Sequence, residues 1–140
     1  MQEINHDKFD GAIMLEINFD ALNESSPILT ANFQKKIGNC NIFVYSNEGD
    51  YVPHFHVVSK STNFDCCIQI NRAKYFKHGK HKDIFINNSQ KKLLNEKLQE
   101  INKKTGNSYW LDIQELYYFA NLNCKEPKVS IQPDYTKLED

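Results

Sequence analysis

The segment that most constrains the fold is a pair of apolar runs separated by a polar turn. Residues 40–46 alternate between side chains that face opposite ways, as in a strand with two distinct faces. The turn at 47–50, Asn-Glu-Gly-Asp, follows directly, so residues 54–59 should return as an antiparallel partner. A hairpin of this kind predicts an antiparallel sheet at the centre of the molecule.

The sequence continues with more extended segments and then changes to a helical period. A third strand is expected at 64–70, and a short strand at 73–76. Ser89 is predicted to cap a helix, and Ser108 to cap a second helix that runs to about residue 121. The stripe of the first helix comprises Leu93, Leu94, Leu98 and Ile101. We therefore predict an α+β fold, an antiparallel twisted sheet of about four or five strands with two C-terminal helices packed on it.

Composition places the chain among ordinary globular domains. Its hydrophobic content is 40 % and its aromatic content is 12 %, which argues against a disordered chain. No apolar run is long enough to span a bilayer, and the first residues lack the basic start and apolar stretch of a signal peptide. We expect a cytoplasmic protein of bacterial or phage origin with no membrane partner.

The cysteines indicate reduced thiols. They are Cys40, Cys66, Cys67 and Cys124, and no two form a C-x-x-C pair. Because a cytosolic protein rarely carries disulfides, all four are expected to be free. The vicinal pair at 66–67 should point to opposite faces of its strand, with one thiol in the core.

The motif at residues 52–57, Val-Pro-His-Phe-His-Val, follows the Glu-Gly-Asp turn and resembles a known family. It is similar to the small prokaryotic family catalogued as domain of unknown function 4160, over about residues 37–101. This chain has Val52 where a second Pro is usual, and it adds an N-terminal arm and a second helix that bears Trp110. The resemblance implies no assigned activity. It implies proximity to small toxin–antitoxin-like partners, and it carries over only His54 and His56 as candidate functional residues.

Residues 1–140 are expected to form one domain, because a chain of this length can bury one substantial core. Its parts are an N-terminal arm at 1–36, a family-like core at 37–104, a second helix at 105–124 and an extended tail at 125–140.

His54 and His56 are the candidate catalytic and metal-binding pair. Alternate residues of a strand share a face about 7 Å apart, so both imidazoles could reach one ion. Further ligands would come from Asp50, Cys66 or Cys67, and His78 or His81. No spacing matches an established zinc motif, and the alternative is a pair of imidazoles that hydrogen-bond to backbone or Tyr groups at the rim of the sheet. No cofactor is expected otherwise, and zinc is the metal that the pair could hold.

A basic segment suggests nucleic acid as a second hypothesis. Residues 1–26 hold six acidic residues and one Lys, a net charge of −5, whereas residues 72–104 carry a net charge of +7. Basic groups bind phosphates, and aromatic rings stack on unpaired bases. The candidate nucleic-acid-binding residues are Arg72, Lys74, Tyr75, Lys77, His78, Lys80, His81 and Lys82. His54 and His56 would then act as acid and base on an RNA phosphodiester; the alternative is a solvated loop.

The leading hypothesis is an interaction or regulatory protein of the mobile-element or toxin–antitoxin type. A sheet edge, two amphipathic helices and a tail would suit pairing with a protein partner or a second copy. The sequence holds no Gly-rich phosphate loop and no G-x-S-x-G elbow, which argues against nucleotide chemistry and that class of hydrolase. The position of the loop at 77–82 distinguishes these hypotheses. A loop beside His54 and His56 would favour metal binding or catalysis, and a loop separated from them by the sheet would argue against both.

Overall fold

The sheet is antiparallel and its strands follow chain order. The computed structural model describes residues 15–19, 38–45, 52–59 and 62–140. Within these residues the strands are β1 (Glu16–Asn18), β2 (Asn39–Phe43), β3 (His54–Ser59) and β4 (Phe64–Gln69), in the order β1-β2-β3-β4. The helices are α3 (Asn88–Gln99) and α4 (Tyr109–Ala120), with short 3-10 helices η2 (Gly79–His81) and η3 (Tyr135–Lys137). The predicted α+β architecture is confirmed.

Register divides the central hairpin into two chemically different faces. His56 pairs with Cys67 across β3 and β4, and Val57 pairs with Cys66. Because side chains alternate along a strand, Val57 and Cys66 enter the hydrophobic core while His56 and Cys67 share the opposite face. The prediction that the vicinal thiols split between faces is confirmed, and Cys66 is the core member.

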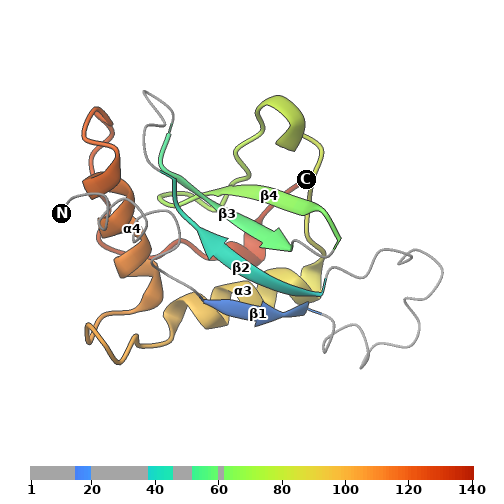
Figure 1. Ribbon diagram of the computed structural model, residues 1–140, viewed down its shortest axis with the longest axis horizontal. Coiled ribbons are helices and arrows are strands. Elements are labelled where there is room, and N and C mark those ends of the chain that lie inside the picture. The colour runs from blue at the N-terminus through green and yellow to red at the C-terminus, as the bar shows by residue number, and fades with distance from the viewer. Residues whose placement is uncertain (1–14, 20–37, 46–51, 60–61) are drawn as a thin grey trace.

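The helices cover the apolar face. Figure 1 shows α3 crossing behind the sheet and α4 standing at one end of it. Leu94 and Leu98 of α3 and Ile113 of α4 are fully buried in the core. Ile101, which was expected in the same stripe, lies beyond the end of α3 and is 58 % exposed.

Side-chain caps set where the helices begin. Asn87 caps α3, since its Oδ1 accepts from the backbone N–H of Gln90 at 2.9 Å and the Gln90 side chain accepts from the N–H of Asn87 at 2.8 Å. The predicted cap at Ser89 was therefore wrong by two residues. Ser108 caps α4 as predicted, with its Oγ accepting from the N–H of Leu111 at 3.1 Å.

The segment after β4 folds back along that strand. The expected strand at 73–76 reduces to a single bridge between Tyr75 and Ile68. The N–H of Phe76 donates to the carbonyl of Cys67 at 2.9 Å, which continues the chain along β4. Tyr75 itself is buried, and its hydroxyl accepts from the N–H of Ile86 at 3.1 Å. These bonds direct the following residues over the histidine-bearing face of the sheet.

Both ends of the described chain contribute to the core. Leu15, Ile17 and Phe19 are buried in the core, and Glu16–Asn18 of the predicted N-terminal arm form the edge strand β1. The tail was expected to be extended with few anchors, but Tyr135 is fully buried and its hydroxyl donates to the carbonyl of Ile70 at 2.7 Å. The turn at 47–50, including Asp50, lies outside the described residues. None of the helices described has the length and hydropathy needed to cross a bilayer.

Replacement of Tyr135 should show that the tail is part of the domain. Tyr135→Ala removes a large buried ring and should lower the free energy of unfolding by about 3–5 kcal/mol. Tyr135→Phe keeps the ring and should cost about 1 kcal/mol through the lost hydroxyl. Ile131→Ala is the control, because Ile131 is 79 % exposed. Urea denaturation measures all three, and equal stability of Tyr135→Ala and Ile131→Ala would show that the tail does not pack.

Candidate metal centre

His54 and His56 lie side by side on β3 and are buried. Their ring centroids are 5.3 Å apart, so the two rings project to the same side of the strand as predicted. His54 is only 1 % exposed and His56 only 7 %. Phe76 packs against His54 with ring centroids 4.6 Å apart, and Tyr45 packs against His56 at 4.7 Å. The predicted alternative of a hydrogen bond to the backbone is present at His54, whose Nδ1 lies 2.9 Å from the carbonyl oxygen of Val52. Burial of this kind restricts the orientation of both rings.

The loop that follows β4 brings two more histidines to the pair. The ring centroid of His81 lies 5.4 Å from that of His56, and the centroid of His78 lies 5.6 Å from that of His54. His78 and His81 are themselves 5.2 Å apart. The four imidazoles thus form a closed ring of neighbours. The structure brings together the two sequence segments whose proximity was left open.

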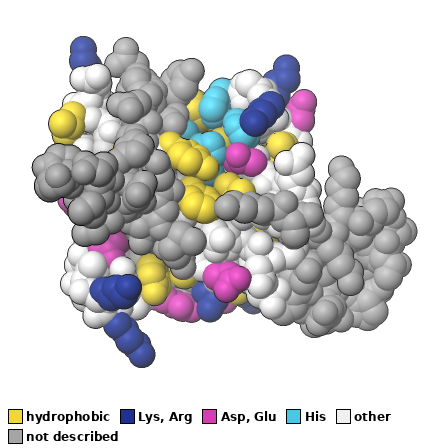
Figure 2. All heavy atoms as spheres, viewed as in Figure 1, with side chains coloured by type: hydrophobic (Ala, Val, Ile, Leu, Met, Phe, Trp, Pro, Cys, Tyr) yellow, Lys and Arg dark blue, Asp and Glu magenta, His cyan; other side chains and the backbone are white. Residues whose placement is uncertain are grey.

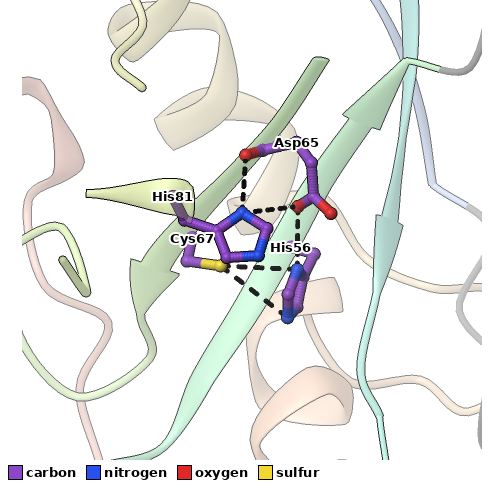
Figure 3. Close-up of side chains that lie close together, drawn as sticks. All are labelled: His56, Asp65, Cys67 and His81. Carbon is purple, nitrogen blue, oxygen red and sulfur yellow. Dashed lines mark hydrogen bonds and ion pairs between the residues drawn. The ribbon is translucent and has the colours of Figure 1, made fainter. Parts of the chain in front are cut away.

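Asp65 and Cys67 of β4 complete the cluster, as Figure 3 shows. Oδ1 of Asp65 lies 2.8 Å from Nδ1 of His56 and 3.7 Å from Nδ1 of His81. Sγ of Cys67 lies 3.4 Å from Nδ1 of His56 and 3.7 Å from its Nε2. One potential ligand atom from each of His56, Asp65, Cys67 and His81 lies within 4.8 Å of every other.

Asp65 is held in its ionised form. Burial alone would raise the pKa of its carboxyl, but the hydrogen bond from His56 and the electrostatic attraction of His56, His81 and Lys80 lower that pKa below its ordinary value. A carboxylate only accepts hydrogen bonds, so Nδ1 of His56 carries the proton between them. The site therefore contains an anion in place before any ligand binds.

Backbone carbonyls orient two of the other rings. Nδ1 of His54 donates to the carbonyl of Val52 at 2.9 Å, and Nδ1 of His81 donates to the carbonyl of Asp65 at 3.1 Å. In a neutral imidazole a protonated Nδ1 leaves the lone pair on Nε2. Metal-binding histidines commonly show this arrangement, because the outer hydrogen bond fixes the tautomer.

The cysteine geometry favours a ligand over a nucleophile. Sγ of Cys67 lies at nearly equal distances from the two ring nitrogens of His56, 3.4 and 3.7 Å, so it is in line with neither. A base that activates a thiol needs a directed hydrogen bond from the sulfur to one nitrogen. Bond lengths of about 2.0–2.3 Å to a tetrahedral zinc instead imply separations of about 3.3–3.7 Å between ligand atoms. The spacing of Cys67 and His56 matches that range.

The thiol of Cys66, next to Cys67 in the chain, lies outside the cluster. Sγ of Cys66 donates to the carbonyl of Ile84 at 3.3 Å on the core side of β4. Burial raises the pKa of the Cys66 thiol well above its ordinary value, and the negative charges of nearby groups add to that rise. Cys66 is therefore a neutral core thiol, and Cys67 is the member of the pair that belongs to the site.

A cleft reaches the cluster from the solvent. Its volume is about 420 Å³, and Asp65, His81 and Lys80 contribute to its wall. Figure 2 shows histidine side chains gathered beside an acidic group on the surface of this face. The Asp65 side chain is 31 % exposed, in contrast to the buried His56. The cluster is thus open on the side of Asp65 and closed on the side of His54.

The basic residues proposed for nucleic-acid binding are dispersed. Nη1 of Arg72 pairs with Glu126 at 3.1 Å, and Nζ of Lys77 lies 5.4 Å from the ring centroid of Phe85. Tyr75 is 6 % exposed, so its ring does not offer a face for stacking on a base. Lys74, Lys80 and Lys82 are exposed. His78 and His81 belong to the buried cluster instead.

Sequence reasoning missed Asp65. The signal was available in the turn after β3, since a hairpin closed around residues 60–63 places Cys67 opposite His56. Asp65 shares the face of Cys67 because it lies two residues away on the same strand. The same register would have selected Cys67 over Cys66 as the candidate ligand.

Comparison with known proteins adds no family to these observations, because no family model, no curated protein and no solved structure matches the chain. The resemblance of residues 52–57 to domain of unknown function 4160 stays a prediction.

Thiol labelling of the native protein should separate the cysteines by exposure. Cys124 is partly exposed, whereas Cys40, Cys66 and Cys67 are buried. A chromogenic disulfide reagent should modify one thiol rapidly and all four after denaturation. Cys124→Ser should abolish the rapid phase. A rapid phase that persists in this variant and disappears in Cys67→Ala would contradict the burial of Cys67.

Proposed function

We propose that this chain is a metal-binding domain and that zinc is the ion that fits its site best. The ligands are His56, Asp65, Cys67 and His81. The observation that carries the proposal is the convergence of four zinc-type ligand atoms within 4.8 Å of one another. A tetrahedral zinc ion holds its ligand atoms about 3.3–3.7 Å apart. Side-chain rotations that close the widest separations, which are at most 4.8 Å, by about 1 Å would bring all four atoms to one ion.

The charges support a divalent ion. Binding requires the thiolate form of Cys67, and Asp65 is already a carboxylate. Zn²⁺ with one thiolate and one carboxylate is electrically neutral, whereas an isolated charge in a buried site would carry a large desolvation penalty. Two neutral imidazoles complete a tetrahedral set without changing this balance.

The scaffold supports the proposal as well. His56, Asp65 and Cys67 belong to one hydrogen-bonded hairpin, so their backbones are fixed relative to one another. Only His81 comes from a short 3-10 helix. The ion would tie that helix to the sheet and replace the proton that now lies between His56 and Asp65. The cleft beside Asp65 supplies the access path.

The other hypotheses stay predictions. An interaction or regulatory role of the toxin–antitoxin type, with a protein partner or a second copy, gains no specific observation from the described residues. For nucleic-acid binding, the buried ring of Tyr75 is not accessible to a base, whereas Lys80 lies at the wall of the cleft.

Metal analysis tests the proposal directly. Protein purified without a histidine tag should contain close to one equivalent of zinc, or take up one equivalent after dialysis against it. An ion present at 100 times its dissociation constant should stabilise the fold by about 2.7 kcal/mol, so a chelator should lower the unfolding temperature by several degrees. A zinc-treated protein with no bound metal and an unchanged unfolding temperature would refute the proposal.

Neighbouring thiols provide a matched pair of variants. Cys67→Ala and Cys66→Ala each remove one buried thiol from β4, but only Cys67 faces the site. Cobalt(II) bound in place of zinc should give a thiolate charge-transfer band in the wild type and in Cys66→Ala. The band should vanish in Cys67→Ala. Its loss from both variants alike, or its retention in Cys67→Ala, would count against Cys67 as a ligand.

Asp65→Asn tests the anionic ligand. The amide has nearly the same shape but no charge, so zinc affinity should fall by at least tenfold while the fold persists. Competition with a fluorescent zinc chelator measures the change, and circular dichroism checks the fold. An unchanged affinity would place Asp65 outside the set of ligands.

A further inference from the structure

A second set of ligand-type side chains shares Cys67 with the site described above. One potential ligand atom from each of His54, Cys67 and His78 lies within 4.8 Å of the others. We propose that this set binds a second metal ion of the soft, monovalent class, copper(I), and that the thiolate of Cys67 bridges the two ions. The proposal rests on the proposed function in sharing that cysteine, but its other ligands are distinct.

His54 is positioned for such a role. Its Nδ1 donates to the carbonyl of Val52 at 2.9 Å, so its neutral ring carries the lone pair on Nε2. The ring packs between Phe76 and Tyr117, with centroid separations of 4.6 and 5.8 Å. An imidazole that is 1 % exposed and held by both a hydrogen bond and aromatic contacts has its ligand atom fixed in direction.

His78 is the third member of this set. Its ring packs on Phe76 with centroids 4.2 Å apart and lies 5.6 Å from the ring of His54. Its Nε2 is buried from solvent. Phe76 therefore contacts both imidazoles and sets the spacing between them. No carboxylate belongs to this set, in contrast to the set that includes Asp65.

The ligand types and the burial select the ion. Thiolate with imidazole suits copper(I), and a set of three protein ligands, two of them buried, suits an ion of low coordination number. Charge points the same way. The charges of zinc, the Asp65 carboxylate and the Cys67 thiolate sum to zero. A second divalent ion would therefore leave a net charge of two in a buried site, whereas a monovalent ion leaves a net charge of one. Hydrocarbon and aromatic neighbours on the closed side make the smaller charge preferable.

The bridge is chemically consistent. Cys67 loses one proton to solvent when the first ion binds, and its thiolate sulfur retains further lone pairs for a second metal–sulfur bond. Binding of copper(I) then requires no oxidant and no additional proton transfer from Cys67. The four imidazoles surround the shared sulfur as two pairs, His56 with His81 and His54 with His78.

Sequential loading tests the proposal. Reduced apoprotein without a tag is first saturated with Zn²⁺ and then titrated anaerobically with Cu⁺ in the presence of a chromogenic copper(I) chelator. We expect one equivalent of zinc to remain bound and one equivalent of copper(I) to be added. Cys66→Ala is the control for loss of a buried thiol and should bind both ions.

Variants assign each ion to its ligands. His78→Asn should lose copper(I) by at least tenfold in affinity and keep zinc, whereas His81→Asn should lose zinc and keep copper(I). Cys67→Ala should weaken both. His54→Asn is a second test of the copper set, and thermal melting checks the fold of each variant. A variant that does not fold is replaced by the corresponding Gln substitution.

Three outcomes would overturn the inference, and they are distinguishable from failure of the zinc site. Zinc-loaded protein that takes up no copper(I) removes the second site and leaves the first. Displacement of zinc by copper(I), with one equivalent bound in total, shows a single shared site. Unchanged copper(I) affinity in both His54→Asn and His78→Asn assigns the ion to other ligands. Copper(I) bound through His54 and His78 without any zinc uptake would refute the proposed zinc site and the thiolate bridge, and would leave the copper(I) ligands in place.

Discussion

The register of the hairpin formed by β3 and β4 determines the site. Pairing of His56 with Cys67 places the imidazole and the thiol directly across the ladder, and Asp65 follows on the same face. A shift of one residue would turn these polar groups into the core and expose Phe55 and Val57. The buried apolar face therefore enforces the geometry of the polar face. In this molecule the hydrophobic effect positions the ligands, although none of them belongs to the hydrophobic core.

The second requirement is a cover for the polar face. Backbone hydrogen bonds from Phe76 to Cys67 and from Gln69 to Lys74, at 2.9 and 2.8 Å, turn the chain back along β4. Tyr75 inserts into the core and anchors this turn, so the residues after it must cross the sheet on the histidine side. That path delivers Phe76, His78 and His81. Core packing of Tyr75 therefore positions the start of the loop that follows β4. Contacts of this loop with the side chains of the cluster position the rest of it.

Much of this arrangement could be predicted from the sequence, and the rest depended on tertiary packing. Alternation along the strands predicted the hairpin, the common face of His54 and His56, and the split of Cys66 from Cys67, because these follow from local geometry. The burial of the histidines and of Tyr135 could not be predicted, since each is covered by residues distant in sequence. Asp65 was missed for another reason. Only the pairing of β3 with β4 places its carboxylate on the face that holds His56 and Cys67.

The energetics argue that the cluster serves a function. Buried imidazoles, a thiol and a carboxylate must be desolvated, and apolar side chains of similar volume would often give equal or greater stability at such positions. The hydrogen bond between His56 and Asp65 offsets part of this penalty, as do the bonds from His54 and His81 to backbone carbonyls. A fold that needed only to cover its sheet would place apolar residues on this face, as it does on the other. Convergence of ligand-type atoms, together with fixed tautomers and an open side at Asp65, is what a metal site requires in advance of its ion. These features support the proposal that the polar face binds a cation.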